Sequence, residues 1–103
     1  MKQYLDPVQT STLIGLGFPQ PKSVSKLSID IDLNFIPSFS YSIGELIEFL
    51  PNYIHWTPMC IHGNVIEYSF GTEESELYCC NKYNELVDNL YDMCVLLKKK
   101  GLI

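Results

Sequence analysis

The apolar positions between Ser42 and Pro51 recur at intervals of three and four residues, the spacing that gives a helix one apolar face. Glu45 stands three residues after Ser42, which is the spacing of a capping box. Pro51 disfavours helical geometry at the residue before it. The pattern predicts a short helix that keeps Glu45 and Glu48 in solvent. Its apolar stripe consists of Ile43, Leu46, Ile47 and Leu50.

Two further helices are predicted towards the ends of the chain. The first begins at Asp6, a cap residue followed by proline, and ends at Gly17. The last covers Lys82–Lys99, with Asn81 as its cap and Gly101 after its end. The first helix draws its apolar surface from Val8, Leu13, Ile14 and Leu16. The last has helical spacing at Tyr83, Leu86, Val87, Leu90, Tyr91, Cys94 and Leu97.

Residues 26–34 alternate between polar and apolar side chains, which is the period of a half-buried strand. The apolar side consists of Leu27, Ile29, Ile31 and Leu33, and the polar side of Ser28, Asp30, Asp32 and Asn34. We expect the apolar side to face the core and the polar side to face water. The segment Phe35–Ser40 contains Pro37, and we expect it to connect this strand to the next helix.

A β-hairpin is predicted over residues 53–70, with Gly63 and Asn64 as its two-residue turn. This turn pairs His62 with Val65, Ile61 with Ile66, Cys60 with Glu67 and Met59 with Tyr68. The core face then carries Met59, Ile61, Ile66, Tyr68 and Phe70, and the outer face Cys60, His62, Val65, Glu67 and Ser69. Pro58 has no backbone donor, so we expect the first strand to lie at an edge or to be bulged there. An acidic loop over residues 71–76 follows.

With a last short strand over residues 77–80, the elements follow the order α-β-α-β-β-(β)-α. A run of strands between helices is typical of the α+β class. We expect a single domain over residues 1–103, with helices packed on one face of a small antiparallel sheet of three to four strands. The helix after Ser42 would pack on apolar positions of that sheet, namely Ile29, Ile31, Leu33, Ile61 and Ile66.

The charge balance of the chain is acidic and argues against some classes of function. Seven lysines, twelve carboxylates and no arginine give a net charge of −5. Arginine is the usual ligand of phosphate and guanine, so we do not expect nucleic-acid binding. No apolar run approaches the roughly 20 residues of a membrane helix, and the first residues lack the apolar stretch of a signal peptide. We therefore expect a cytoplasmic protein, without membrane contact, whose four cysteines are reduced.

Several stretches of the chain resemble a known group of proteins. They are the helix written from Tyr41 to Pro51, the opening Thr12–Phe18, and the closing Asn84–Tyr91 with the terminal Lys100–Ile103. Together they are similar to small proteins from phages and prophages of gut bacteria. The resemblance covers most of the chain and implies a compact α+β fold and a mobile-element origin. The group has no assigned activity, so the resemblance transfers no functional residue.

Two constellations could carry chemistry. Cys60, His62 and Glu67 would share the outer face of the hairpin, and zinc takes ligands of these types. Three ligands fall short of a closed structural site, and a solvent-facing patch explains the same residues. Cys79 and Cys80 lie shortly before the last helix, whose N-terminus could lower a thiol pKa, but no motif links either to a histidine. We expect no bound metal, no cofactor and no catalytic residue.

Aromatic and acidic side chains are the candidates for a protein interface. Trp56, Tyr53 and Tyr78 are not accounted for by the core pattern, and aromatic residues are enriched in interface hot spots. Asp88 and Asp92 are like charges one helical turn apart, a mildly destabilising arrangement that a basic partner would offset.

The sequence thus favours a non-enzymatic accessory protein of a phage or mobile element that acts through protein–protein contacts. Its partner is unknown; a host protein or a second copy in a homodimer would fit. One alternative is a small metal- or thiol-dependent protein that uses Cys60, His62, Cys79 and Cys80. A second is an acidic inhibitor of a host nucleic-acid-binding protein.

Overall fold

The computed structural model describes residues 1–70 and 76–103, and it has the predicted α+β class. Its elements are α1 (Pro7–Gly15), β1 (Ser23–Ile29), β2 (Phe35–Ser40), α2 (Ile43–Phe49), β3 (Tyr53–Ile54), β4 (Thr57–His62), β5 (Val65–Tyr68), β6 (Tyr78–Cys80) and α3 (Leu86–Lys99). The predicted order is present, with β2 and β3 as additional strands. Strands β3-β4-β5-β6 form one antiparallel sheet, and β1-β2 form a separate two-stranded sheet. Of the predicted acidic loop, residues 71–75 lie outside the described residues.

Helix α2 confirms the predicted capping box. The Ser42 hydroxyl accepts a hydrogen bond from the Glu45 backbone N–H at 3.2 Å, and the Glu45 carboxylate accepts one from the Ser42 N–H at 3.2 Å. At the other end Leu50 leaves the helix with ψ at 136°, directly before Pro51. Leu46, in the centre of the apolar stripe, has no exposed surface.

Helix α1 begins as predicted, with Asp6 as its cap and a second capping box formed by Gln9. It ends at Gly15, and Gly17 follows in the left-handed region with φ at 96°, where glycine is favoured. Leu13 is fully buried, as expected for the apolar surface. Val8 is 76% exposed, so its predicted place in that surface is wrong.

Helix α3 begins at Leu86, and the predicted start at Lys82 with Asn81 as the cap is wrong. The physical reason is the buried side chain of Asn89. Its amide donates to the carbonyls of Asn64 (2.6 Å) and Tyr83 (2.9 Å), and its oxygen accepts from the Tyr83 N–H (3.0 Å). These bonds hold the chain before the helix in a turn that joins it to the β4–β5 hairpin.

The four-stranded sheet confirms the predicted register of its central hairpin. All four predicted pairs, from Met59 with Tyr68 to His62 with Val65, are present. β6 pairs with β5, which confirms the last short strand predicted over residues 77–80. β4 lies between β3 and β5, and Pro58 pairs with Tyr53 without a shift in register, so neither the edge nor the bulge predicted at Pro58 is present.

The single strand predicted over residues 26–34 is wrong. β1 ends at Ile29, the chain turns, and β2 returns antiparallel over the segment expected to be a connection. The Asp30 carboxylate accepts hydrogen bonds from the backbone N–H groups of Asp32 (2.9 Å) and Asn34 (2.8 Å). Asp30 is therefore a turn residue, and the alternation after Ile29 does not belong to a strand.

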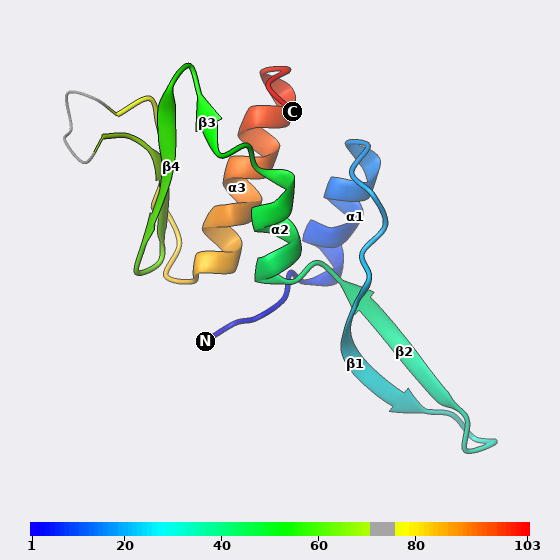
Figure 1. Cartoon of the computed structure of the whole chain (residues 1–103). Coiled ribbons are helices and arrows are strands. Elements are labelled where there is room, and N and C mark those ends of the chain that lie inside the picture. Colours follow the sequence, from blue (N-terminus) through cyan, green and yellow to red (C-terminus); the bar gives the residue numbers. More distant parts are fainter. Residues whose placement is uncertain (71–75) are drawn as a thin grey trace.

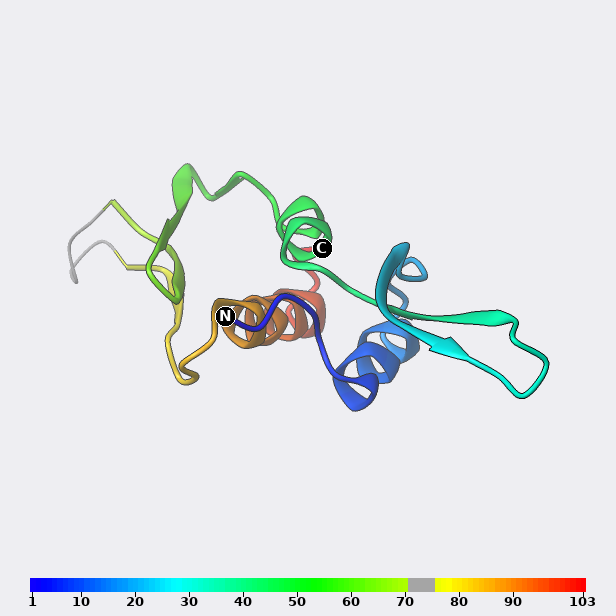
Figure 2. The same cartoon turned by 90° about the horizontal axis from the view of Figure 1, so that it is seen from below.

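The core lies where α2 and the sheet meet α3. Helix α3 packs against β5 and β6, and α2 packs on α3, where the Cys94 thiol lies 3.9 Å from the Leu46 carbonyl oxygen. Figures 1 and 2 show the three helices gathered in the middle of the molecule, with the larger sheet on one side. The expected packing of α2 on Ile29, Ile31 and Leu33 is wrong, because these side chains are 60–96% exposed. Phe49 of α2 instead contacts Phe18, at 5.2 Å between ring centroids.

The β1–β2 hairpin projects from the helices on the side opposite the larger sheet (Figures 1 and 2). The molecule measures 58 × 27 × 18 Å, with a radius of gyration of 15.5 Å. A compact chain of this length has a radius of gyration of about 13 Å, so the projection lengthens the molecule appreciably. None of the described helices has the length and apolar character needed to cross a bilayer.

Candidate functional site

The β1–β2 hairpin, residues 23–40, carries one face made of apolar side chains, which we call the arm face. The register pairs Val24 with Phe39, Leu27 with Pro37, and Ile29 with Phe35. Paired residues share a face of the hairpin and successive residues alternate, so these six side chains lie on the same side. The opposite face carries Ser23, Lys26, Ser28, Ile36, Ser38 and Ser40.

A β-bulge brings Val24 onto the arm face. Val24 and Leu27 are three residues apart, which in a regular strand would place them on opposite sides. The register shifts between Val24 and Lys26, so that Ser25 is the extra residue of a bulge. The apolar face therefore extends from the base of the hairpin to its turn.

The rest of the described chain leaves the arm face uncovered. Val24 and Phe39 at the base are 47% and 49% exposed, and Leu27, Ile29 and Phe35 are 57–66% exposed. These five side chains expose about 500 Å² of apolar surface, given the usual size of such groups. At about 25 cal/mol per Å², the apolar contribution from covering that area is roughly 12 kcal/mol before the entropy cost of association. That is a large exposed patch for a small protein.

The turn of the hairpin holds two more apolar side chains in solvent. Ile31 is 96% exposed and Leu33 is 79% exposed. Leu33 has φ at 64°, an uncommon conformation for leucine. The backbone N–H of Leu33 and the side chain of Asn34 both bond Asp30, which stabilises this conformation. The tip is thus a defined turn that presents apolar groups.

Glu45 attaches the base of the hairpin to α2. Besides capping the helix, its carboxylate accepts the Lys22 N–H at 2.9 Å and the Ser23 hydroxyl. Partial burial on its own would raise the pKa of Glu45, but the hydrogen bonds from Ser23, Lys22 and Ser42 outweigh it and hold the pKa below its ordinary value. The prediction that Glu45 faces solvent is therefore wrong, whereas Glu48 is exposed.

Among the predicted interface aromatics, two lie on the open surface. Trp56 is 90% exposed in the two-residue turn between β3 and β4, and Tyr53 is 65% exposed in β3 just before it. His55 and Trp56 both have positive φ, at 48° and 68°.

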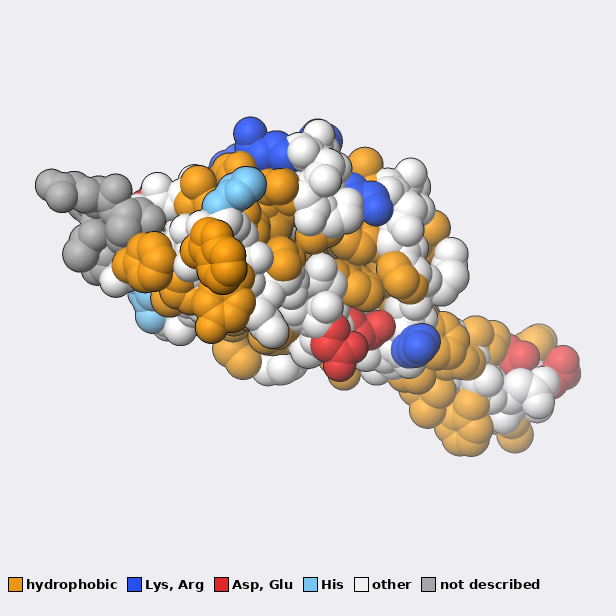
Figure 3. Space-filling view, turned by 45° about the horizontal axis from the view of Figure 1, so that its top comes forward, with side chains coloured by type: hydrophobic (Ala, Val, Ile, Leu, Met, Phe, Trp, Pro, Cys, Tyr) orange, Lys and Arg blue, Asp and Glu red, His pale blue; other side chains and the backbone are white. Residues whose placement is uncertain are grey.

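Tyr78 is half-buried, with the Lys100 ammonium 5.6 Å from its ring centroid. Phe70 is 64% exposed, so its predicted place on the core face is wrong. Figure 3 shows apolar side chains at the end of the molecule that holds the larger sheet and, separately, on the projecting hairpin.

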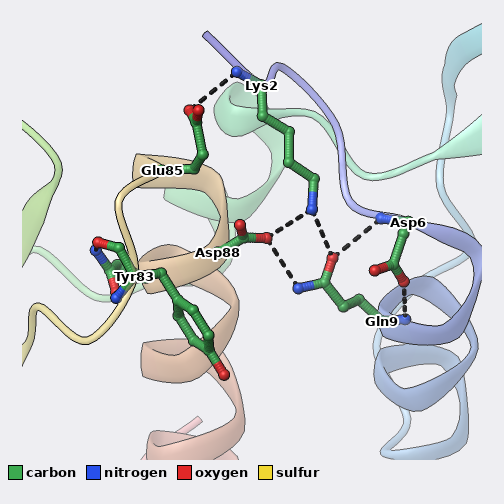
Figure 4. Close-up of polar contacts among 7 residues, drawn as sticks. Lys2, Asp6, Gln9, Tyr83, Glu85 and Asp88 are labelled. Atoms are coloured by element: carbon green, nitrogen blue, oxygen red, sulfur yellow. Dashed lines mark hydrogen bonds and ion pairs between the residues drawn. The ribbon is translucent and has the colours of Figure 1, made fainter.

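Of the two predicted interface carboxylates, Asp88 is bound by groups of the chain itself. The Lys2 ammonium lies 2.7 Å from Asp88, and the Gln9 amide donates to the same oxygen at 2.9 Å (Figure 4). The Lys2 backbone N–H donates to Glu85 at 3.0 Å. Burial raises the pKa of Asp92, Lys82 opposes the rise and Asp88 adds to it. Asp88 thus has an internal basic partner, which ties the N-terminal segment to α3.

The predicted metal-binding group is only partly brought together. His62 Nε2 lies 3.1 Å from Glu67, as their shared face requires, but the Cys60 thiol donates to the Ser69 carbonyl at 3.4 Å. A different set converges, because ligand atoms of Glu67, Glu76 and Cys79 all lie within 4.8 Å of one another.

The thiols of α3 and β6 are not activated as nucleophiles. Burial raises the pKa of Cys80 to about 11 and that of Cys94 to about 12. Burial, with Glu76 and Glu67 adding to it, also raises the pKa of Cys79. Because α3 begins only at Leu86, its N-terminus does not lower these values. Residues 1–70 and 76–103 enclose no pocket.

The arm face was not predicted from the sequence. The signal was present in the segment Phe35–Ser40, which alternates apolar and polar side chains apart from Ile36 and follows a turn-forming Asp30. Two alternating runs separated by such a turn predict a hairpin. Comparison with protein families, with curated proteins and with solved structures found no match.

Proposed function

We propose that the chain is a non-enzymatic accessory protein that acts by binding another protein molecule through the arm face. The observation that supports this is the concentration of Val24, Leu27, Ile29, Phe35, Pro37 and Phe39 on one face of a projecting hairpin. A face of about 500 Å² lies towards the upper end of what soluble monomers expose, and patches of this size are often functional. Binding a protein removes that surface from water.

The proposal includes a phage or mobile-element origin and a cytoplasmic site of action. The resemblance in Thr12–Phe18, Tyr41–Pro51 and Asn84–Tyr91 supports the origin. The acidic composition without arginine supports a protein partner over a nucleic acid. An acidic inhibitor of a nucleic-acid-binding protein is less favoured, because Asp88 and Glu45 bind groups of the chain itself.

A metal-dependent role is a second candidate, favoured by the convergence of Glu67, Glu76 and Cys79. Two carboxylates and a thiol are ligands that zinc accepts. Zinc titration of the reduced protein, with the rate of Cys79 alkylation as the readout, tests this role. Protection that is lost in Glu67→Gln supports the site, and unchanged alkylation rules it out.

The leading proposal is tested by affinity capture with three tagged forms of the protein. The arm variant carries Leu27→Ser, Ile29→Ser and Phe35→Ser, and the control carries Ser28→Ala and Ser38→Ala on the opposite face. We expect the wild type and the control to retain one stoichiometric protein, and the arm variant to lose it. The retained protein is either a different protein or an untagged copy of the chain. Equal recovery with all three forms, or recovery with none, would overturn the proposal.

A further inference from the structure

We infer that the partner of the arm face is a second copy of this chain, bound as a two-fold symmetric dimer. The inference rests on the proposed function, since it names the occupant of the same surface. Its basis is the chemistry and the extent of the face, together with the properties of the hairpin edges.

The edges of the hairpin are poorly suited to pairing with another strand. On β2, Pro37 lacks the backbone N–H that a neighbouring strand would need. On β1, the bulge at Ser25 interrupts the regular ladder. Both features are known to protect edge strands from association. Contact through the face is therefore favoured over extension of the sheet.

The arm face is self-complementary in charge. Lys26 is the one charged residue in the two strands, and it lies on the opposite face. A two-fold interface brings each patch against its own copy, so a patch with a net charge would repel itself, whereas an uncharged apolar patch does not. Homodimer interfaces are accordingly more apolar than those of transient complexes.

The area is sufficient for a specific dimer. The five large side chains of the face expose about 500 Å² in each copy. Two copies together bring roughly 1,000 Å² to the interface, which is about the smallest area of a specific protein–protein interface.

The register also places the symmetry axis. Leu27 and Pro37 form the central pair of the face, between Val24–Phe39 at the base and Ile29–Phe35 near the turn. A two-fold axis through the central pair allows all three pairs of both copies to be buried. With the arms antiparallel, this axis sets the tip of each arm over the base of the other.

The oligomeric state of the purified protein tests the inference. We expect sedimentation to show a dimer for the wild type and for the control variant Ser28→Ala/Ser38→Ala. The arm variant Leu27→Ser/Ile29→Ser/Phe35→Ser should be a folded monomer, with the circular dichroism spectrum of the wild type, because its substitutions lie outside the core cluster. A wild-type monomer, or an arm variant that stays dimeric, would overturn the inference.

Disulfide trapping tests the position of the axis without removing apolar groups from neighbouring positions. Both variants are made in a Cys60→Ser/Cys79→Ser background. Leu27→Cys should form a disulfide-linked dimer on mild oxidation. Ser28→Cys, on the opposite face, should give at least tenfold less of the disulfide-linked dimer. Equal trapping at both positions would show random collision and would contradict the symmetric dimer.

The outcomes distinguish this inference from the proposed function. If the wild type is monomeric but captures a different protein through the arm face, the second copy is excluded and the binding function stands. If nothing binds the arm face in either experiment, both fail.

Discussion

At the residue scale, Asn89 determines where α3 begins. It is fully buried and makes three hydrogen bonds that connect α3, the turn at Tyr83 and the hairpin turn at Asn64. Asn64 adds a bond of its own, from its side chain to the Tyr83 carbonyl at 2.7 Å. Buried polar groups that lose their partners are costly, so this cluster links helix and sheet strongly.

Asn89→Ala should therefore destabilise the protein by about 2–4 kcal/mol, since it leaves backbone groups of Tyr83 and Asn64 without their partners. The matched control is Asn81→Ala, which changes an exposed asparagine that does not cap α3. The free energy of unfolding in urea measures both effects. A smaller loss for Asn89→Ala than for Asn81→Ala would contradict the role assigned to the cluster.

A second prediction at the residue scale concerns Glu45 and the pH dependence of stability. Its folded-state pKa is lowered from the ordinary value of 4.5, so folding favours the ionised carboxylate. The stabilisation is present above the ordinary value and is lost as the pH falls through the lower folded-state value. We expect the wild type to be more stable than Glu45→Gln at pH 7 and the difference to shrink below about pH 4.

Urea unfolding between pH 3 and pH 7 measures that difference, and Glu48→Gln is the control on the same helix. Glu48 is exposed, so its substitution should leave stability nearly unchanged at every pH. A Glu45→Gln difference that stays constant across the range would show that the carboxylate contributes through packing and not through its charge.

At the scale of elements, α2 belongs to the core. Leu46 is fully buried on its inner face and Glu48 is exposed on its outer face. Leu46→Asp places a carboxylate in the core, at a cost near the whole stability of a small domain, about 5 kcal/mol or more. We expect it to unfold the protein at 25 °C, whereas Glu48→Ala should change the melting temperature by less than about 3 °C.

Thermal melts followed by circular dichroism check this prediction. A cooperative melt for Leu46→Asp, combined with loss of the captured partner, would make α2 an interface helix. Retained helical content with a native near-ultraviolet spectrum would by itself contradict the expected unfolding.

The elements also show which structure could be predicted from the sequence. Caps and hairpin turns act over a few residues, so α2, the start of α1 and the β4–β5 register followed from Ser42, Asp6 and Gly63. The alternation in residues 26–34 indicated one apolar side. It did not indicate whether other parts of the chain bury that apolar side. Burial of Asn89 could not be predicted either, because its partners are 25 and 6 residues away.

For the candidate site, the sequence supplied residue types without their neighbours. Trp56 and Tyr53 were interface candidates because no core pattern needed them, and both are exposed in the structure. The contact of Asp88 with Lys2 could not be predicted, because the two residues are 86 positions apart along the chain. Long-range pairs of this kind depend on the packing of α1 and the N-terminal segment beside α3.

At the scale of the whole molecule, the protein divides into a core of helices and sheet and a projecting arm. Ser23 and Ser40 mark the base, where Glu45 binds the first and the second is buried. None of the arm-face residues belongs to the core cluster. We therefore expect a variant in which residues 25–38 are replaced by a short Asn-Gly turn to fold, with a cooperative melt.

The dimer proposal gives this variant a distinct dependence on concentration. Association stabilises the folded state by mass action, so the melting temperature of the wild type should rise by several degrees between about 1 and 100 μM. The truncated variant should melt at one temperature across that range, close to the wild-type value at the lowest concentration. A wild-type melting temperature that does not change would show that its arm face stays uncovered. Failure of the truncated variant to fold would show that the arm belongs to the folding core, because the base contacts at Glu45 then depend on the complete hairpin.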